Sequence, residues 1–266
     1  MKVSAFDQTD LNLLPGLQPD GWGDITPSFD FYTTSSFCFP IKIISDDKIV
    51  GIGTTIIHHD VAWLAHIIVH KEHRKNGIGK LITETLVDSL QSKNCETIYL
   101  LATDLGAPVY EKVGFETETE YLFFKDIKPG NGLTISESIM PYKEDFKEQI
   151  KGIDKITSGE DRIFHLEDHL QNGFVYSEKG IVHGFYLPTF GDGLIIATNS
   201  SAGLEFLQFH LSSKEKLVFP KDNSAATNYL YKKGYKETIT GKRMRLGKKR
   251  DVNFKNIYNR IGGNLG

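Results

Sequence analysis

Hydrophobic residues follow a regular pattern between residues 37 and 124, and this pattern predicts a sheet with flanking helices. Hydrophobic stretches predict strands at 39–44 and 49–57, joined by the polar turn Ser45-Asp46-Asp47-Lys48. A third strand is expected at 61–69, after the turn His58-His59-Asp60. The short connections indicate that these three strands are antiparallel neighbours.

The spacing of the hydrophobic residues becomes helical after residue 73. Apolar residues recur at the spacing of an amphipathic helix from Ile78 to Ser92. The apolar run 98–102 then predicts a strand buried on both faces, and 107–112 predicts a short helix that ends at Gly114. A last strand is expected at 121–124.

The segment 125–132 combines proline, glycine and charged residues, which is typical of a domain boundary. It predicts a first domain at 1–128, a second domain that begins near Leu133 and spans 129–250, and a C-terminal tail at 251–266 that we expect to be loosely ordered. The second half repeats the first in outline, and Val109–Phe115 is similar to Leu230–Tyr235. We interpret the chain as a divergent internal duplication with an α/β fold. The other helices predicted in the second half lie at 142–153, 162–171, 202–211 and 225–233, with a hairpin at 173–186.

Composition narrows the possible functions. The 266 residues are 39% hydrophobic and 24% charged, as in soluble globular proteins, and they suffice for two cores. A net charge of −3 leaves no basic field that would hold a nucleic acid or an anionic membrane. No apolar run approaches the roughly 20 residues that cross a bilayer, and the N-terminus lacks the apolar core of a signal peptide.

The two cysteines, Cys38 and Cys95, lie far apart and form no Cys-x-x-Cys pair. We therefore expect no disulfide framework or zinc site, and a cytoplasmic location. Adjacent histidines in the 58–60 turn would point in opposite directions, so we expect no metal there either. The basic run from Lys242 to Arg250 is expected to be a solvated strand end.

The segment after the third strand has the pattern of an anion-binding loop. A predicted strand runs into a loop that holds Arg74, Gly77 and Gly79, and the loop opens a helix. Backbone N–H groups at a helix N-terminus, with no Cβ at the glycines, can close on a pyrophosphate. A P-loop would need glycine at Arg74 and serine or threonine at Leu81, and a dinucleotide fingerprint would need a small residue at Ile82. The loop therefore predicts a phosphate-bearing cofactor held by neither of those motifs.

The pattern Arg74-x-x-Gly77-x-Gly79 on a strand-loop-helix resembles motif A of the GNAT superfamily, the acetyl-CoA-dependent N-acetyltransferases. Tyr110-x-x-x-Gly114-Phe115 lies at the distance where GNAT proteins place the motif that closes over coenzyme A. Trp63-Leu64 and 101–110 are similar to a bacterial GNAT subfamily with a fused second GNAT-like half, which 158–162, 219–226 and 243–247 also resemble. The resemblance implies tandem GNAT-like folds with mixed, mostly antiparallel central sheets flanked by helices.

The resemblance also implies roles for individual residues. The strand would offer backbone groups to the pantetheine arm, the loop and first helical turn would hold the pyrophosphate, and Tyr110 would be the catalytic acid that protonates the departing thiolate. Thr103 stands where many GNAT enzymes have an asparagine near the cofactor. The implied cofactor-binding residues are Ile67, Ile68, Val69, Arg74, Lys75, Asn76, Gly77, Ile78, Gly79, Lys80, Thr103 and Tyr110.

His66 precedes these residues on the strand and is a second catalytic candidate. A basic imidazole there could help to deprotonate an amine, and a packed, hydrogen-bonded histidine is the alternative. No acidic residue lies on the strand at 98–101, so the general base stays unassigned. A backbone N–H near Ile68 is the candidate for stabilising the oxyanion.

Together these features predict an N-acetyltransferase that transfers the acetyl group of acetyl-CoA, its co-substrate, to a primary amine of a small molecule by direct attack. The alternatives are a protein amine as acceptor, an acyl-CoA-binding sensor without turnover, and a structural partner protein. A homodimer also stays open.

The second half is expected to lack a cofactor site. Its junction at 197–203 has one glycine and no arginine, which makes a poor pyrophosphate cradle. We therefore expect one cofactor site, in the first half. Asp161, Arg162 and Tyr186 are candidates for lining the acceptor cleft.

Overall fold

A computed structural model describes residues 1–128 and 136–266, and its contacts divide the chain into two compact units. The first unit comprises 1–117, 244–248 and 263–265; the second comprises 118–243, 249–262 and residue 266. The expected linker lies partly outside the described residues, as does the expected domain start at Leu133. Because the first unit takes segments from both ends of the chain, the units do not coincide with two halves of the sequence, and the boundary at 128 stays a prediction.

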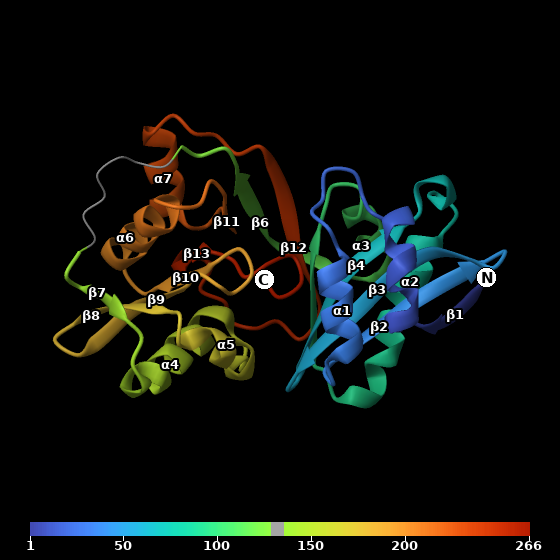
Figure 1. Ribbon diagram of the computed structural model, residues 1–266, viewed down its shortest axis with the longest axis horizontal. Coiled ribbons are helices and arrows are strands. Elements are labelled where there is room, and N and C mark those ends of the chain that lie inside the picture. Colours follow the sequence, from blue (N-terminus) through green and yellow to red (C-terminus); the bar gives the residue numbers. More distant parts are fainter. Residues whose placement is uncertain (129–135) are drawn as a thin grey trace. The chain divides into compact units, whose positions relative to one another are not determined.

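The first unit is built on a sheet whose strands lie in the order β1-β2-β3-β4-β5, followed by β12 (Figure 1). Neighbours from β1 to β4 are antiparallel, and β4 is parallel to β5. The three antiparallel strands predicted at 39–69 and the strand predicted at 98–102 are therefore confirmed. The strands are β1 (Lys2–Ala5), β2 (Cys38–Ser45), β3 (Lys48–His58), β4 (Val61–Val69) and β5 (Thr97–Ala102). Of β12 (Ile239–Gly247), only residues 244–247 belong to this unit.

The helices of the first unit include α2, which packs closely on the sheet because β3 carries glycines opposite it. A Cβ at Gly51 or Gly53 would lie 2.8 Å from the Ile82 side chain of α2. Gly114 ends α3 with a φ of 105°, as predicted from its position. The helical elements are η1 (Gln8–Gly16), α1 (Thr26–Thr34), η2 (Lys71–His73), α2 (Ile78–Ser89), η3 (Gln91–Lys93) and α3 (Ala107–Val113).

The second unit contains a five-stranded sheet in the order β13-β10-β9-β8-β7, while β11 pairs with β6. Phe206, Phe219 and Leu230 are fully buried in its core. The strands are β6 (Glu116–Phe124), β7 (Ile139–Pro141), β8 (Phe174–Glu178), β9 (Ile181–Leu187), β10 (Leu194–Ala197), β11 (Leu217–Pro220) and β13 (Ile257–Asn259). The helical elements are η4 (Glu144–Phe146), α4 (Lys147–Ser158), α5 (Ile163–Leu170), α6 (Ser200–Leu211), α7 (Ser224–Lys232) and η5 (Phe254–Asn256).

The two units repeat one strand-helix-strand-helix segment, β4-α2-β5-α3 in the first and β10-α6-β11-α7 in the second. The ends of α3 and α7 match in their hydrogen bonds. Phe115 N–H donates to the Tyr110 carbonyl at 3.0 Å, and Tyr235 N–H donates to the Leu230 carbonyl at 3.1 Å. Both helices end at a glycine with positive φ. In this register, Leu230 stands where the first unit has Tyr110.

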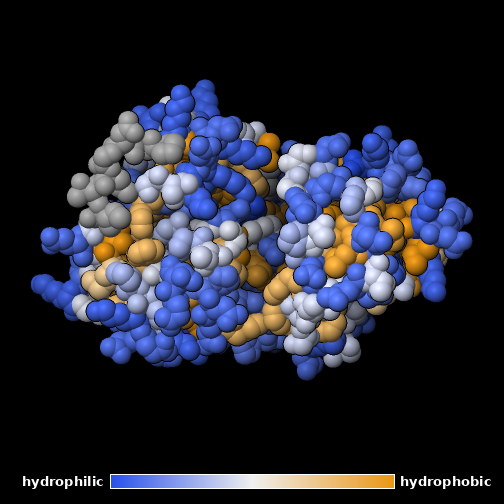
Figure 2. All heavy atoms as spheres, in the orientation of Figure 1, coloured by the Kyte–Doolittle hydropathy of each residue, from blue (hydrophilic) through white to orange (hydrophobic). Residues whose placement is uncertain are grey.

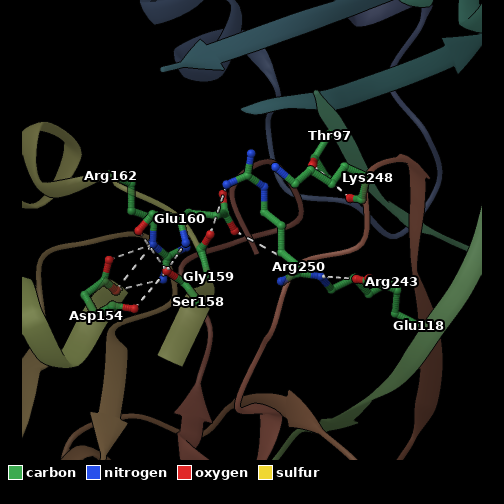
Figure 3. Close-up of polar contacts among 10 residues, drawn as sticks. All are labelled: Thr97, Glu118, Asp154, Ser158, Gly159, Glu160, Arg162, Arg243, Lys248 and Arg250. Atoms are coloured by element: carbon green, nitrogen blue, oxygen red, sulfur yellow. Dashed lines mark hydrogen bonds and ion pairs between the residues drawn. The ribbon is translucent and has the colours of Figure 1, made fainter. Parts of the chain in front are cut away.

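Two sequence-based expectations for the C-terminal region are wrong. Residues 251–266 are not loosely ordered, because β13 pairs with β10 and its Tyr258 is buried. The basic run is not wholly solvated either. Arg243 is 1% exposed, and its guanidinium lies 3.2 Å from Glu118 and 3.6 Å from Glu160, both acids of the same unit (Figure 3). These side chains stabilise the second unit from inside, which the sequence pattern did not reveal.

The acceptor-lining candidates of the second half occupy structural positions. Arg162 is 3% exposed and pairs with Asp154 at 3.0 Å, and Figure 3 shows the two side chains pointing toward one another. Tyr186 is buried, with its Oη 2.9 Å from His210 Nδ1. Asp161 pairs with Lys155 at 3.3 Å. The geometry therefore gives Arg162 and Tyr186 roles in the core of the second unit.

Candidate active site

Strand β4 contains a bulge at His66. The pairing register between β3 and β4 shifts between Ile52 and Thr54, so Gly53 alone faces two residues of β4, His66 and Ile67. His66 has a φ of 48°, in the left-handed region that histidine tolerates better than most residues. A bulge of this kind increases twist and bends its strand. The bend begins where β4 leaves its parallel neighbour.

The pairing between β4 and β5 covers only the first part of β4. In the described part of the chain, its register runs from Val61 opposite Thr97 to Leu64 opposite Leu100 and then ends. Residues 65–69 of β4 therefore lie beyond the paired stretch. Parallel strands that part in this way leave backbone donors and acceptors along the inner edge of the sheet.

The bulge also decides which residues face that edge. His70 N–H donates to the Val50 carbonyl at 2.9 Å, and hydrogen-bonded pairs alternate along an antiparallel ladder. Two residues back, Ile68 is again in a hydrogen-bonded position opposite β3, so its backbone groups face β3. Ile67 and Val69 point their backbone groups to the opposite edge, which β5 no longer covers. Of the three predicted pantetheine residues, Ile67 and Val69 are therefore the ones whose backbone groups lie along the uncovered edge.

The loop after β4 forms an exposed, positively charged turn. Arg74 folds back so that its Nε donates to the Val69 carbonyl at 3.2 Å, while the rest of its side chain stays exposed. Lys75 and Gly77 both have positive φ, 66° and 79°. Gly77 is the N-cap of α2 and supplies no side-chain cap, and no atom lies within 4 Å of the place where its Cβ would be. No side chain caps the first N–H groups of α2, which is what an anion site requires.

Gly79 marks the point where three elements meet. A Cβ on Gly79 would lie 3.7 Å from Val69 Cγ2 on β4 and 3.9 Å from Val109 Cγ1 on α3. The end of β4 and the first turns of α2 and α3 therefore lie side by side, and the predicted pyrophosphate loop adjoins the helix of Tyr110. The Lys80 ammonium lies 3.4 Å from the Glu84 carboxylate, so its charge is partly offset.

Tyr110 lies inside this arrangement. It is 9% exposed and packs in the same core as Leu64 and Leu100. Burial raises the pKa of Tyr110 to about 12, so the phenol keeps its proton at neutral pH. Among the residues that the structure describes, none makes a hydrogen bond to its hydroxyl. Thr103, an exposed residue, turns the chain into α3 by accepting hydrogen bonds from Gly106 N–H on both its carbonyl and its Oγ1.

The imidazole of His66 lies among aromatic side chains from the N-terminal segment. The ring centroids of Tyr32, Phe29 and Trp22 are 5.6, 5.8 and 6.1 Å away. Its Nδ1 lies 3.0 Å from Tyr32 Oη, which also accepts a hydrogen bond from Asn264 Nδ2 at 3.1 Å. Burial lowers the pKa of His66 to about 4, so the imidazole is neutral near pH 7. The structure thus supports the packed, hydrogen-bonded interpretation, in a place next to the open strand edge.

The equivalent place in the second unit is filled by the chain itself. Strand β13 pairs with β10, and the next residue, Arg260, donates its N–H to the Val218 carbonyl of β11 at 2.9 Å. The Tyr258 ring packs so tightly on α6 that a Cβ at Gly203 would lie 2.1 Å from it. Asn199 caps α6 by accepting a hydrogen bond from Ala202 N–H at 2.9 Å. Neither an open strand edge nor an uncapped helix start is available at this junction.

Residues of the site that the pattern did not reveal come from the two ends of the chain. Trp22, Phe29 and Tyr32 lie in a segment without a regular hydrophobic period, and Asn264 lies in the segment taken as a tail. Hydrophilic and hydrophobic residues share the surface of the first unit in Figure 2. Trp22, 46% exposed, is one of its exposed large hydrophobic residues. The one available signal was the Thr26-Pro27 step after Asp24, a helix start that predicts α1.

Two features are absent from the residues that the structure describes. None of their helices is both long and apolar enough to span a bilayer. They also hold no group of three or more His, Cys, Asp or Glu side chains placed to bind a metal.

A parted strand pair beside an uncapped, glycine-bearing helix start defines an α/β protein that can hold an extended, phosphate-bearing ligand along a strand edge. The family model described as "Acetyltransferase (GNAT) family" matches residues 10–115, which include most of this site. Residues 10–115 of this chain are therefore similar to the GNAT acetyltransferases.

Solved structures show that the likeness extends over both units. A presumed acetyltransferase from Pyrococcus horikoshii has a TM-score of 0.82 at 19% identity, over 100% of this chain and 95% of that chain. A tandem GNAT protein from the clavulanic acid biosynthesis pathway has a TM-score of 0.60 at 11% identity, over 92% of this chain and 98% of that chain. The tandem GNAT-like fold predicted from the sequence is therefore confirmed.

Among curated proteins, the [ribosomal protein bS18]-alanine N-acetyltransferase of Salmonella typhimurium is 28% identical over 82 residues. The match covers 30% of this chain and 55% of the relative, little more than half the relative's length.

Proposed function

We propose that the first unit binds acetyl-CoA and transfers its acetyl group to a primary amine of a small molecule. The observation that carries the proposal is the meeting, at Gly79, of an open strand edge with a helix start that has neither a side-chain cap nor a Cβ at Gly77. The strand edge suits the amides of a pantetheine arm, and the helix start suits a pyrophosphate.

The residues fit the cofactor by position. Ile67 and Val69 would bind the pantetheine amides, with Ile68 holding their strand in the sheet. Lys75, Asn76, Gly77, Ile78, Gly79 and Lys80 would surround the pyrophosphate. The Arg74 guanidinium, held through Nε, would direct its other nitrogens to a phosphate oxygen. Thr103 would lie near the cofactor at the start of α3.

Acetyl-CoA supplies the acetyl thioester when it is bound. The neutral amine attacks the thioester carbonyl, the C–S bond breaks, and the departing thiolate ends as a thiol while the amine loses a proton. We assign the oxyanion contact to the backbone N–H of Ile67 rather than Ile68, because Ile68 faces β3. A donor of this kind contributes about 3 kcal/mol to transition-state stability.

Tyr110 would act on the leaving group mainly as a hydrogen-bond donor. An ordinary thiol has a pKa of about 8.5, whereas burial raises the pKa of Tyr110 to about 12. Complete proton transfer from this phenol to a thiolate is therefore unfavourable, and a hydrogen bond to the developing negative charge is the better role. Water would then supply the proton to the thiolate and remove the proton from the amine.

The proposal places one acetyl-CoA on each chain. In the second unit, β13 and Arg260 lie where the parted strands of the first unit leave an edge open, Asn199 caps the helix, and Leu230 replaces the tyrosine. The acceptor could instead be a protein amine, as the name of the Salmonella relative states for that protein. We propose a cytoplasmic reaction, where the free thiols of Cys38 and Cys95 stay reduced, and a homodimer remains compatible with it.

An amine-library screen for thiol released from acetyl-CoA tests the proposal. We expect release with one class of small primary amines, and loss of release in the Gly77→Asp variant, whose carboxylate would occupy the anion site. Acetyl-CoA binding without release from any amine would favour a sensor. No acetyl-CoA affinity by calorimetry would favour a structural partner protein, and full activity of Gly77→Asp would remove the cradle from the mechanism.

A further inference from the structure

The hydrogen bonds around His66 connect three side chains from distant parts of the sequence. The amide nitrogen of Asn264 donates to Tyr32 Oη at 3.1 Å, and the same oxygen lies 3.0 Å from His66 Nδ1. All three residues belong to the first unit. Tyr32 is 1% exposed, so water has little access to its hydroxyl.

The direction of these hydrogen bonds follows from what each group can do. An amide NH₂ only donates, so the Tyr32 oxygen acts as its acceptor. The phenol has one proton of its own to donate, and His66 Nδ1 is in place to accept it. In a neutral imidazole only one nitrogen carries a proton. When Nδ1 accepts, the proton must be on Nε2.

We propose that Asn264 is a positioning residue that fixes this tautomer, so that His66 presents an N–H donor and not a basic nitrogen. None of the residues that the structure describes engages Nε2, which leaves this donor for a ligand. His66 lies at the bulge directly before Ile67, the residue assigned to the oxyanion. Its part in catalysis rests on the proposed function, and there it donates a hydrogen bond to an oxygen of the reacting groups. The tautomer itself does not depend on that function.

The assignment has a consequence for the general base. A base needs a lone pair on the nitrogen that meets the substrate, and in this tautomer Nε2 has none to offer. The expectation that His66 deprotonates the amine therefore gives way to removal of the proton by water. Asn264 controls this choice through Tyr32, without contact with the substrate.

Replacing the amide of residue 264 by a carboxylate can reverse the direction of these hydrogen bonds. A carboxylate only accepts, so in the Asn264→Asp variant Tyr32 would donate to residue 264. The Tyr32 oxygen would then accept from Nδ1–H, and Nε2 would carry the lone pair. The Asn264→Ala variant removes the donor to Tyr32 without supplying an acceptor, so neither direction of the hydrogen bonds is favoured. Asn172→Asp is a matched control, because Asn172 is exposed and lies in the second unit.

Long-range ¹H–¹⁵N correlation spectra of the ¹⁵N-labelled full chain at pH 7 read the tautomer directly. The His66 signals are assigned by their absence in His66→Asn. We expect a protonated Nε2 in the wild type and in Asn172→Asp, a protonated Nδ1 in Asn264→Asp, and a mixture in Asn264→Ala. A protonated Nδ1 in the wild type, or an unchanged pattern in Asn264→Asp, would overturn the proposal.

Kinetic measurements then distinguish His66 as a hydrogen-bond donor from His66 as a general base. For a donor, Asn264→Asp lowers kcat about tenfold, the effect of one hydrogen bond of about 1.4 kcal/mol, and leaves the KM for acetyl-CoA unchanged. For a base, the same variant would raise kcat, because it frees the lone pair, and that outcome would overturn the catalytic part. If the chain acetylates no amine, the spectra still decide the tautomer, so the two proposals fail separately.

Discussion

Acidification should weaken the first unit through His66. Burial lowers the pKa of this imidazole to about 4, whereas in the unfolded chain it titrates near 6.5. Below pH 6.5 the unfolded chain takes up a proton that the folded chain refuses, so the free energy of unfolding falls as the pH falls. The contribution is fully present above pH 6.5 and is lost down to about pH 4.

The size of the effect follows from the two pKa values. One pKa unit corresponds to about 1.4 kcal/mol, so between pH 7 and pH 4.5 the loss due to His66 is about 2.5 kcal/mol. His66→Asn is the appropriate variant, because asparagine also accepts the left-handed conformation that residue 66 adopts. Other histidines titrate in both proteins and cancel in the comparison.

Urea unfolding followed by tryptophan fluorescence measures this difference selectively, because both tryptophans, Trp22 and Trp63, lie in the first unit. The stability of the wild type minus that of His66→Asn should fall by about 2.5 kcal/mol between pH 7 and pH 4.5. A difference that stays constant across this range would refute the claim that His66 is held neutral by burial. It would also weaken the description of its surroundings as dry and aromatic.

Three further predictions concern the cofactor site. Tyr110→Phe should lower kcat about 100-fold and leave the melting temperature unchanged, because no described residue bonds to its hydroxyl; an unchanged kcat would remove Tyr110 from the reaction. Arg74→Ala should weaken acetyl-CoA binding about tenfold at low salt in calorimetry, and less at 0.5 M NaCl, since the contact is a charged hydrogen bond; equal loss at both salts would argue for a packing role. Calorimetry of the wild type should give one acetyl-CoA per chain, and the Gly77→Asp variant should bind none. Binding that persists in this variant would reveal a site in the second unit.

The elements that the sequence predicts well are those whose own pattern decides their structure. The strands β2, β3 and β4 are hydrophobic runs separated by polar turns, and Gly114 ends α3 because a positive φ is needed there. The cradle was also predictable, since Arg74, Gly77 and Gly79 are contiguous in the chain. Local chemistry in each case left one structural solution.

What the sequence did not reveal depends on contacts between distant residues. The backbone groups of Ile67 and Ile68 face opposite edges of β4, and the bulge opposite Gly53 decides which residue faces which edge. The hydrophobic pattern of the sequence does not predict this bulge. Tyr32 meets His66 across 34 residues of chain, and Asn264 meets Tyr32 across 232. Arg243 reads as one cation in a basic run, and only its buried acidic partners make it a core residue.

The duplicated halves show how one scaffold can keep a ligand site or close it. Each unit has a strand, a helix, a second strand and a helix that ends in the same glycine turn, so the backbone alone does not determine binding. In the first unit Gly77 leaves the helix start open, while in the second Asn199 satisfies it and Tyr258 presses on Gly203. The residues that fill the second junction are followed within a few positions by Asn264, which orients Tyr32 in the first unit. The segment 257–264 therefore carries two tasks, and substitutions at its two ends should separate them: those near Tyr258 should affect the stability of the second unit, and those at Asn264 the chemistry at His66.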